Sequence, residues 1–224
     1  MAASALPRAS LDNQKLVLVT ANKGGAGKTT TCVNLSTAAA KDGRRVLGID
    51  LEPQHNFSKW AARRPKEHPA IHVIEGDLDS YQSALLRAAD YDVVIVDTPP
   101  GIGASMVAIQ ALAKRADLVV VPTGLGIFDL ETVIPYARAL QNTTGERVSF
   151  VLNRIDSRIK NSDLRETIAA LMSAGKVNNL PIPDLVDIER FMRGGISIVD
   201  SPVKAHTNTV LALWQYVKGE MNVG

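Results

Sequence analysis

The sequence lacks most features that mark secreted, membrane or strongly nucleic-acid-binding proteins. Its 224 residues include one cysteine, Cys32, which cannot form an internal disulfide and so favours a reducing cytoplasm. The sequence contains no run of about 18 apolar residues, the length that a membrane-spanning helix needs. The first residues lack the apolar core of a signal peptide. The formal net charge is only +2, so any contact with nucleic acid must come from a local patch.

The composition also argues against a disordered chain and against several domains. Hydrophobic residues make up 46% of the sequence and charged residues 21%, which suits one well-buried domain. No internal repeat or low-complexity linker divides the chain. We therefore expect a mobile N-terminal tail at residues 1–14 and a single domain at residues 15–224.

Apolar, strand-like runs alternate with helix-like stretches. The expected strands cover residues 16–20, 45–50, 70–74, 92–97, 117–122 and 148–153, and the expected helices cover residues 28–41, 77–89, 105–113, 130–141, 163–173 and 208–220. The run DVVIVD at 92–97 is almost entirely β-branched, which is typical of a central parallel strand buried on both faces. The alternation predicts a doubly wound α/β fold, with a mostly parallel sheet and helices on both faces.

Polar features follow the ends of four expected strands. They are the loop 21–27, Asp50, Asp97 and Asn153. Ligands of doubly wound sheets bind beyond the carboxyl ends of the strands, where these features would meet. The sequence therefore predicts one ligand site at this edge of the sheet.

The stretch KGGAGKTT at 23–30 has the chemistry of a phosphate-binding loop. Gly24, Gly25 and Gly27 let the backbone turn tightly and point its N–H groups inward, and the following helix adds its positive N-terminal end. Lys28 can reach the β- and γ-phosphates, and Thr29 can offer its hydroxyl to Mg²⁺. We therefore expect this loop to bind a nucleotide with its metal.

The loop departs from the standard pattern G-x-x-x-x-G-K-[ST]. Asn22 stands where that pattern has its first glycine, and Lys23 adds a second lysine that phosphate binding alone does not require. A glycine-rich turn with two solvated lysines is the alternative, but the strand–loop–helix context disfavours it. A dinucleotide-binding loop is also disfavoured, because GxGxxG does not occur here.

KGGAGKTT resembles the deviant Walker A motif of the ParA/MinD family of ATPases. Three further stretches resemble motifs of that family and follow in its order, namely VLGIDLEPQHN, VVIVDTPPG and VLNRID. The resemblance spans about residues 15–220. It implies a P-loop NTPase of the deviant Walker A type that binds ATP and Mg²⁺ and forms an ATP-dependent homodimer, with two nucleotides held between two subunits.

The resemblance also implies roles for individual residues. Lys23 would be the signature lysine, which reaches the partner subunit's nucleotide and stabilises transition-state charge as an arginine finger does. Asp97 would bind the metal and Asn153 the adenine side of the nucleotide; the alternative for Asp97 is to cap the next turn, and for Asn153 an ordinary turn after the strand. The nucleotide-binding residues would be Lys23, Gly24, Gly25, Ala26, Gly27, Lys28, Thr29, Thr30, Asn153 and Arg154, and the metal-binding residues would be Thr29, Asp50 and Asp97.

Glu52 departs from the family pattern. The second acidic motif of the family is usually DxDPQ, and its second acid orients the attacking water; that acid is Glu52 here. Glu keeps the carboxylate but its side chain is one methylene longer than that of Asp. A displacement of the catalytic group near 1 Å can lower the rate about 10²-fold. We expect Lys23, Lys28 and Glu52 to be catalytic, with hydrolysis that is slow without a partner.

The C-terminal part of the sequence indicates whether the protein binds a membrane or DNA. The stretch TNTVLALWQYVKGEMNVG has apolar positions at helical spacing but only Lys218 is basic, so we expect a helix that packs on the body and not on a membrane. The stretch IERFMRGGISIVDSP resembles the late region of the family, where DNA-contacting basic residues often lie. Arg190, Arg193 and Lys204 are therefore the predicted DNA contacts, with solvated surface charges as the alternative.

The resemblance to the ParA/MinD family implies a short ParA-type partition ATPase, cytoplasmic and associated with the nucleoid. No helix-turn-helix domain fits ahead of the first expected strand. The ATP-bound dimer would bind DNA non-specifically, and a ParB-like partner would stimulate Mg²⁺-dependent hydrolysis to segregate plasmid or chromosomal DNA. The alternatives are a ParA-like positioner of a protein cargo, a VirC-like conjugation helper, or a nucleotide-operated switch with negligible hydrolysis. Lys23 and the DLEPQ stretch disfavour a dethiobiotin-synthetase-like enzyme.

Overall fold

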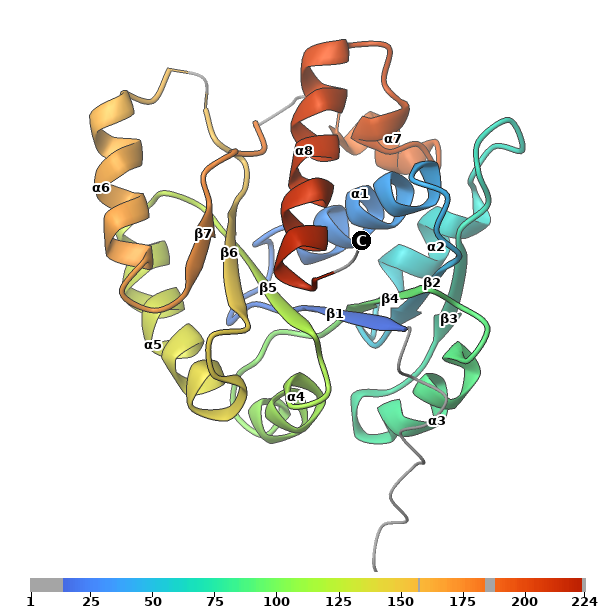
Figure 1. Ribbon diagram of the computed structural model, residues 1–224, viewed down its shortest axis with the longest axis horizontal. Helices are drawn as coiled ribbons and strands as arrows, with labels where there is room; N and C mark the ends of the chain where they lie inside the picture. The colour runs from blue at the N-terminus through green and yellow to red at the C-terminus, as the bar shows by residue number, and fades with distance from the viewer. Residues whose placement is uncertain (1–13, 157, 184–187, 223–224) are drawn as a thin grey trace, which may run out of the picture.

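A computed structural model describes residues 14–156, 158–183 and 188–222, apart from the side chain of Glu189. Of the predicted tail at residues 1–14, only Gln14 falls within these ranges, so the tail itself stays a prediction. Within the described residues, the chain forms one seven-stranded sheet between two layers of helices (Figure 1). This arrangement confirms the predicted α/β class.

All the strand pairs of the sheet are parallel, and the strand order is β3-β2-β4-β1-β5-β6-β7. The central trio places Val19 beside Asp97 and Asp97 beside Asp50, so the carboxyl ends of β1, β4 and β2 finish at one edge. The strands are β1 (Lys15–Val19), β2 (Val46–Asp50), β3 (His72–Glu75), β4 (Val93–Asp97), β5 (Leu118–Thr123), β6 (Val148–Leu152) and β7 (Lys176–Asn178).

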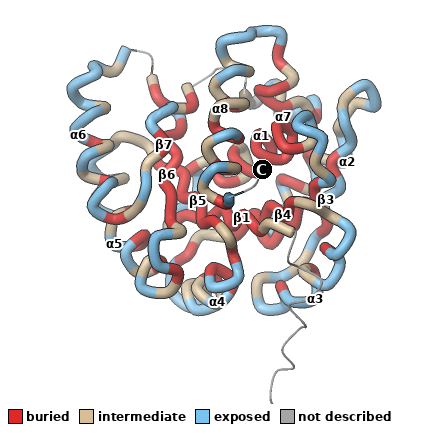
Figure 2. Tube along the Cα trace, viewed as in Figure 1, coloured by how far each residue is buried: buried red, intermediate tan, exposed pale blue. Residues whose placement is uncertain are grey.

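Helices cover both faces of the sheet. The first face carries α1 (Lys28–Lys41), α2 (Asn56–Ala62), α7 (Ile188–Arg193) and α8 (Lys204–Glu220), and the second carries α3 (Tyr81–Leu85), α4 (Ser105–Ala113), α5 (Ile127–Thr144) and α6 (Asn161–Leu171). The central strands are buried almost throughout between these layers (Figure 2). Alternate residues serve opposite cores: Val17 faces the first and Leu18 the second. Burial on both faces explains why the strands read as continuous apolar runs.

Several elements differ from the sequence-based prediction. The single helix expected at 77–89 is divided into η2 (Leu78–Ser80), α3 and η3 (Leu86–Ala88), because both ends tighten into 3₁₀ turns. Helix α5 extends beyond the predicted 130–141 at both ends, and α8 begins at Lys204 instead of residue 208. The elements α2, α7 and β7 were not predicted, since they span too few residues to establish a hydrophobic period.

Helix α8 packs on the body of the protein, as predicted. Its apolar positions Val210, Leu213, Trp214 and Val217 are buried against the first face of the sheet. The indole N–H of Trp214 donates to Asp42 at 3.0 Å. In the described part of the chain, no helix is both long and apolar enough to cross a membrane.

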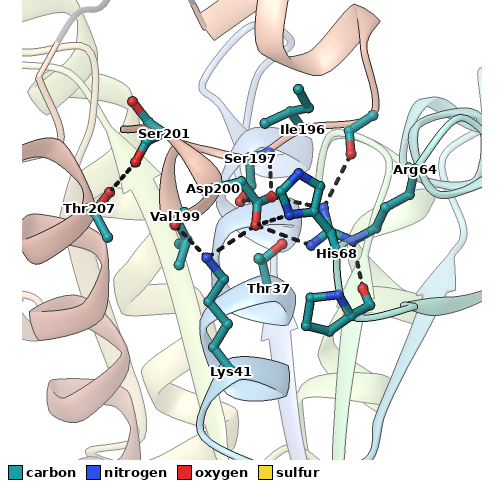
Figure 3. A network of polar contacts seen from close by, with 12 residues as sticks. Thr37, Lys41, Arg64, His68, Ile196, Ser197, Val199, Asp200, Ser201 and Thr207 are labelled. Carbon is teal, nitrogen blue, oxygen red and sulfur yellow. Dashed lines mark hydrogen bonds and ion pairs between the residues drawn. The ribbon is translucent and has the colours of Figure 1, made fainter. Parts of the chain in front are cut away.

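A buried carboxylate, Asp200, connects three separate segments on this first face (Figure 3). Its side chain is 0% exposed and accepts hydrogen bonds from Arg64 Nη1 at 2.9 Å and from the Ser197 hydroxyl at 2.9 Å. Lys41 Nζ, at the end of α1, lies 3.2 Å from the same carboxylate, and His68 Nδ1 lies 3.3 Å away. Burial alone would raise the pKa of Asp200, but the bonds from Arg64 and Ser197 outweigh burial and hold it at about 2.

We expect Asp200→Asn to lower the free energy of unfolding by about 3 kcal/mol at neutral pH, because it leaves the buried Arg64 guanidinium without its anion. The folded-state pKa of Asp200 lies below its ordinary value, so the ionised form stabilises the fold above about pH 4, and this stabilisation is lost as the pH falls towards 2. Urea unfolding at pH 7, 5 and 3.5 would measure the difference from wild type, with the exposed Asp90→Asn as control. Equal stability of Asp200→Asn and wild type at pH 7 would show that the cluster does not stabilise the fold.

Candidate nucleotide-binding site

The loop between β1 and α1 has the backbone geometry of an anion cradle. Gly25 and Gly27 have φ angles of 73° and 92°, a left-handed conformation that favours glycine. Gly27 is also the N-cap of α1, and no side chain caps this helix end. The first backbone N–H groups of α1 are therefore available to an anion at the positive end of the helix.

A cavity of about 780 Å³ opens beside this loop at the carboxyl edge of the sheet. Lys28 is 7% exposed at the start of α1, and its Nζ donates to the carbonyl of Lys23 at 3.4 Å. Residues of the loop, of the segment after β2 and of the end of β6 meet around the cavity. The lining residues are Gly24, Gly25, Gly27, Lys28, Thr29, Thr30, Glu52, Gln54, Asn56, Pro100, Asn153, Arg154 and Ile188.

Two of the three predicted metal-binding side chains are in direct contact. The Thr29 hydroxyl donates to Asp97 Oδ2 at 2.6 Å, and Asp97 is 0% exposed at the end of β4. Burial raises the pKa of Asp97 to about 7, although the bond from Thr29 lowers it. Its other oxygen, Oδ1, is buried with no hydrogen-bond partner among the described residues. An oxygen of this kind suits a cation or a water held by one.

Thr29 and Asp97 fit a Mg²⁺ ion that takes part of its ligands from the phosphates of a nucleotide. Within the described ranges, no group of three or more His, Cys, Asp or Glu side chains could hold a metal without help. Mg²⁺ commonly takes one or two protein oxygens and completes its shell with water and substrate phosphates. Thr29 and Asp97 would supply the protein side of such a shell.

Asp50, the third predicted metal-binding residue, has its oxygens occupied by backbone groups. Oδ2 accepts from the Ser58 N–H at 2.9 Å and Oδ1 from the Glu52 N–H at 3.2 Å. Burial raises the pKa of this carboxyl, which is 0% exposed. In this geometry Asp50 fixes the turn that carries Glu52 and the beginning of α2.

Glu52 reaches the rim of the cavity on the turn after β2. Its Oε2 accepts from the Gln54 N–H at 2.9 Å, and the residue is half-exposed. Gln54 and Asn56 line the cavity beside it, and neither was predicted as a site residue. Their position directly after the acidic stretch was the signal available for finding them.

Lys23 lies outside the cavity that Lys28 lines. Its side chain is 45% exposed and forms an ion pair with Asp129, in the first turn of α5. The two residues line a second cavity of about 330 Å³, which shares Gly25, Asn153 and Arg154 with the first. The two lysines of the loop thus line different cavities, and nothing in the sequence had indicated Asp129 as the partner of Lys23.

Asn153 and Arg154 hold the loop from the end of β6. Asn153 is 2% exposed, and its amide donates to the carbonyl of Ala26 at 3.3 Å. Arg154 Nη1 donates to the carbonyl of Gly25 at 3.3 Å. A Cβ added to Gly27 would lie 1.8 Å from Asn153 Nδ2, so the close approach of β6 requires glycine there. Both side chains line the cavity, where the prediction placed the adenine side.

The predicted DNA contacts lie apart from the loop. Arg190 and Arg193 are exposed on α7, and Lys204 is exposed at the first position of α8. Helix α7 begins at Ile188, which lines the cavity, so this surface adjoins the nucleotide site on one side. Their role stays a prediction.

The comparisons with known proteins agree with this geometry. A family model described as the CobQ/CobB/MinD/ParA nucleotide binding domain matches residues 17–198. Maintenance of carboxysome distribution protein A of Gloeobacter kilaueensis is 36% identical over 147 residues, which cover 64% of this chain and 65% of that protein. The chromosome-partitioning ATPase Soj of Thermus thermophilus is 33% identical over 141 residues, which cover 50% of this chain and 55% of that protein. The matches span less than two thirds of the length of these relatives.

Solved structures show the same fold at lower sequence identity. The MinD cell division protein of Aquifex aeolicus superposes with a TM-score of 0.75 at 17% identity, covering 92% of this chain and 97% of that one. This likeness concerns the arrangement of the sheet and helices. It confirms the doubly wound fold, in which the loop, Asp50, Asp97 and Asn153 follow the carboxyl ends of four parallel strands.

Proposed function

The chain belongs to the CobQ/CobB/MinD/ParA nucleotide-binding family, and from this premise we propose that it is a ParA-type ATPase that dimerises on ATP, binds DNA without sequence preference and positions a cargo. The function is a cycle: the ATP-bound dimer holds DNA, a ParB-like partner bound to the cargo stimulates hydrolysis, and the separated subunits release the DNA. The cargo is a plasmid or a chromosomal region.

The placement of the two lysines carries this proposal. Lys28 lines the large cavity, so it serves the nucleotide of its own chain. Lys23 does not line that cavity and forms an ion pair with Asp129 within its own chain. A second copy, facing the first across the loops, would offer Lys23 a phosphate in place of this carboxylate. A cation supplied in this way stabilises transition-state charge and makes dimerisation depend on the bound nucleotide.

The other site residues have roles that follow from their contacts. Backbone N–H groups of Gly25 to Thr30 surround the phosphates, and Thr29 with Asp97 would hold Mg²⁺, which neutralises phosphate charge when bound. Asn153 can donate to and accept from an adenine edge. Glu52, carried on the turn that Asp50 fixes, is the residue that orients the attacking water.

A protein cargo is a second candidate, supported by a specific similarity. The carboxysome-distribution protein of Gloeobacter kilaueensis is 36% identical over its matched region. The ATPase, the dimer and the DNA surface would be shared between the two functions, and only the cargo and its adaptor would differ. Pull-down with the product of the neighbouring gene would distinguish a centromere-binding partner from a protein-cluster adaptor.

We expect the protein to be retained on a long non-specific duplex only with ATP and Mg²⁺, and to be lost as salt rises. The physical reason is that phosphate contacts release counterions, so the logarithm of the affinity falls linearly with the logarithm of the salt concentration. Retention on immobilised DNA without nucleotide, with ADP and with ATP plus Mg²⁺ measures this directly.

Equal retention in all nucleotide states would contradict a switch, and no retention in any state would remove DNA from the proposed function. The control is Lys28→Ala, which disables the phosphate loop and should behave with ATP as wild type does without nucleotide.

A further inference from the structure

The loop between α2 and β3, residues 63–71, lies directly beside the end of α7. Arg64 Nη1 donates to the carbonyl of Gly195 at 3.2 Å, and Trp60 Nε1 donates to the carbonyl of Ile196 at 3.2 Å. Gly195 has a φ of +69°, and a Cβ added there would lie 2.5 Å from the carbonyl of Arg63. The two segments are therefore packed backbone to backbone, and their outer surfaces are continuous.

Residues 56–71 and 188–204, which contain these two stretches, each begin at the nucleotide cavity and contribute to the Asp200 cluster. Asn56, the first residue of α2, and Ile188, the first residue of α7, line the cavity. At the far ends, Arg64 from the loop and Ser197 from the segment after α7 meet on the carboxylate of Asp200 (Figure 3). The nucleotide site and this surface are thus joined by two short helices, α2 and α7.

Positive charge is concentrated in these two segments. Residues 56–71 and 188–204 together hold seven Lys and Arg against three Asp and Glu, whereas the rest of the chain holds 18 against 20. The two segments therefore carry a formal charge of +4 and the remainder −2. One of the three acids, Asp200, is buried and paired with Arg64 and Lys41. Its negative charge therefore does not offset the exposed lysines and arginines of these segments.

Arg63 and Lys66 are the outward-facing cations of the loop. Both residues are exposed, and neither side chain has a hydrogen bond or ion pair within the described ranges. Arg64, between them, is the opposite case: its side chain is 3% exposed and satisfied by Asp200. The loop thus uses one arginine to anchor itself and presents two cations to solvent beside the helix that carries Arg190 and Arg193.

We propose that Arg63 and Lys66 contact the phosphate backbone of duplex DNA and form, with α7, one continuous non-specific binding surface. This inference rests on the DNA binding of the proposed function and extends its surface to a loop that the sequence analysis did not select. Long, exposed cations on a loop suit phosphate contacts, which fix position on the duplex and carry no sequence information. Since α2 begins at the cavity, the nucleotide site and these contacts share one helix.

The test compares Arg63→Ala/Lys66→Ala with Lys114→Ala/Arg115→Ala. The control pair is exposed directly after α4, on the opposite face of the sheet, and removes the same charge. Affinity for a long non-specific duplex is measured with ATP and Mg²⁺ over a range of salt. Each lost phosphate contact reduces the salt slope by about 0.9, so the loop variant should lose about two units of slope, and roughly 10- to 100-fold in affinity near 0.1 M salt, for each subunit of the dimer that contacts the DNA. The control pair should bind like wild type.

The outcomes separate the two proposals. A wild-type protein that never binds DNA with ATP would overturn both the DNA-binding function and this surface. Wild-type binding with an unchanged slope and affinity in Arg63→Ala/Lys66→Ala would overturn the surface alone. An ATP affinity and a thermal midpoint equal to wild type would show that the loop variant is folded, so that weaker DNA binding reports on lost contacts.

Discussion

Replacing Lys23 by alanine is expected to lower ATP turnover by roughly 10³-fold or more, the size of effect that a cation supplied in trans has in phosphoryl transfer. The variant should also fail to dimerise on ATP while still binding one nucleotide per chain. These two expectations follow from the geometry, because Lys28 lines the nucleotide cavity and Lys23 is paired with Asp129 outside it. Binding of a fluorescent ATP analogue, light scattering and phosphate release measure the three properties separately.

Mixing two inactive variants gives a sharper form of the same prediction. Lys23→Ala keeps Glu52, and Glu52→Gln keeps Lys23, so a mixed dimer should contain one site with both groups. Activity should therefore reappear on mixing, whereas each variant alone stays inactive. No recovery, or a loss of nucleotide affinity in Lys23→Ala alone, would show that Lys23 serves its own chain. Lys160→Ala, at an exposed lysine, is the matched control.

The parts of the fold that could be predicted are those whose signals are local in sequence. The bounds of α1 and α4 match the expected residues, and the expected strand cores lie within a residue or two of those observed. Buried parallel strands must be apolar on both faces, and a phosphate loop must place glycines at left-handed positions such as Gly25 and Gly27. Such requirements act on neighbouring residues, so they can be read without knowing the tertiary structure.

The parts that could not be predicted depend on contacts between distant segments. Lys23 and Asp129 are 106 residues apart, and Arg64 and Asp200 are 136 apart. No spacing rule relates such pairs, because their meeting depends on how α5 and the segment after α7 pack on the sheet. The same holds for α2 and α7, which are short and are held in place mainly by Trp60, Arg64 and Gly195.

Glu52→Gln is expected to lower the turnover number by about 10²-fold or more, the contribution typical of a positioned general base or water-orienting group. The amide keeps the shape of the side chain and removes its charge, so ATP-dependent dimerisation and DNA retention should persist. Glu52→Asp should keep turnover within about ten-fold of wild type, since the carboxylate remains and only its reach changes. Steady-state phosphate release with DNA and partner present is the measurement, and Glu166→Gln, at an exposed position of α6, is the control.

The same variants test whether hydrolysis ends the DNA-bound state. Glu52→Gln removes only the hydrolytic step, so its dimers should stay on DNA longer than wild type by about the factor by which turnover falls. Turnover equal to wild type in both Glu52→Gln and Glu52→Ala would exclude Glu52 from the chemistry. Slow turnover combined with wild-type release from DNA would mean that nucleotide exchange resets the cycle. The chain would then be a nucleotide-operated switch in which Glu52 supports hydrolysis but hydrolysis does not set the lifetime on DNA.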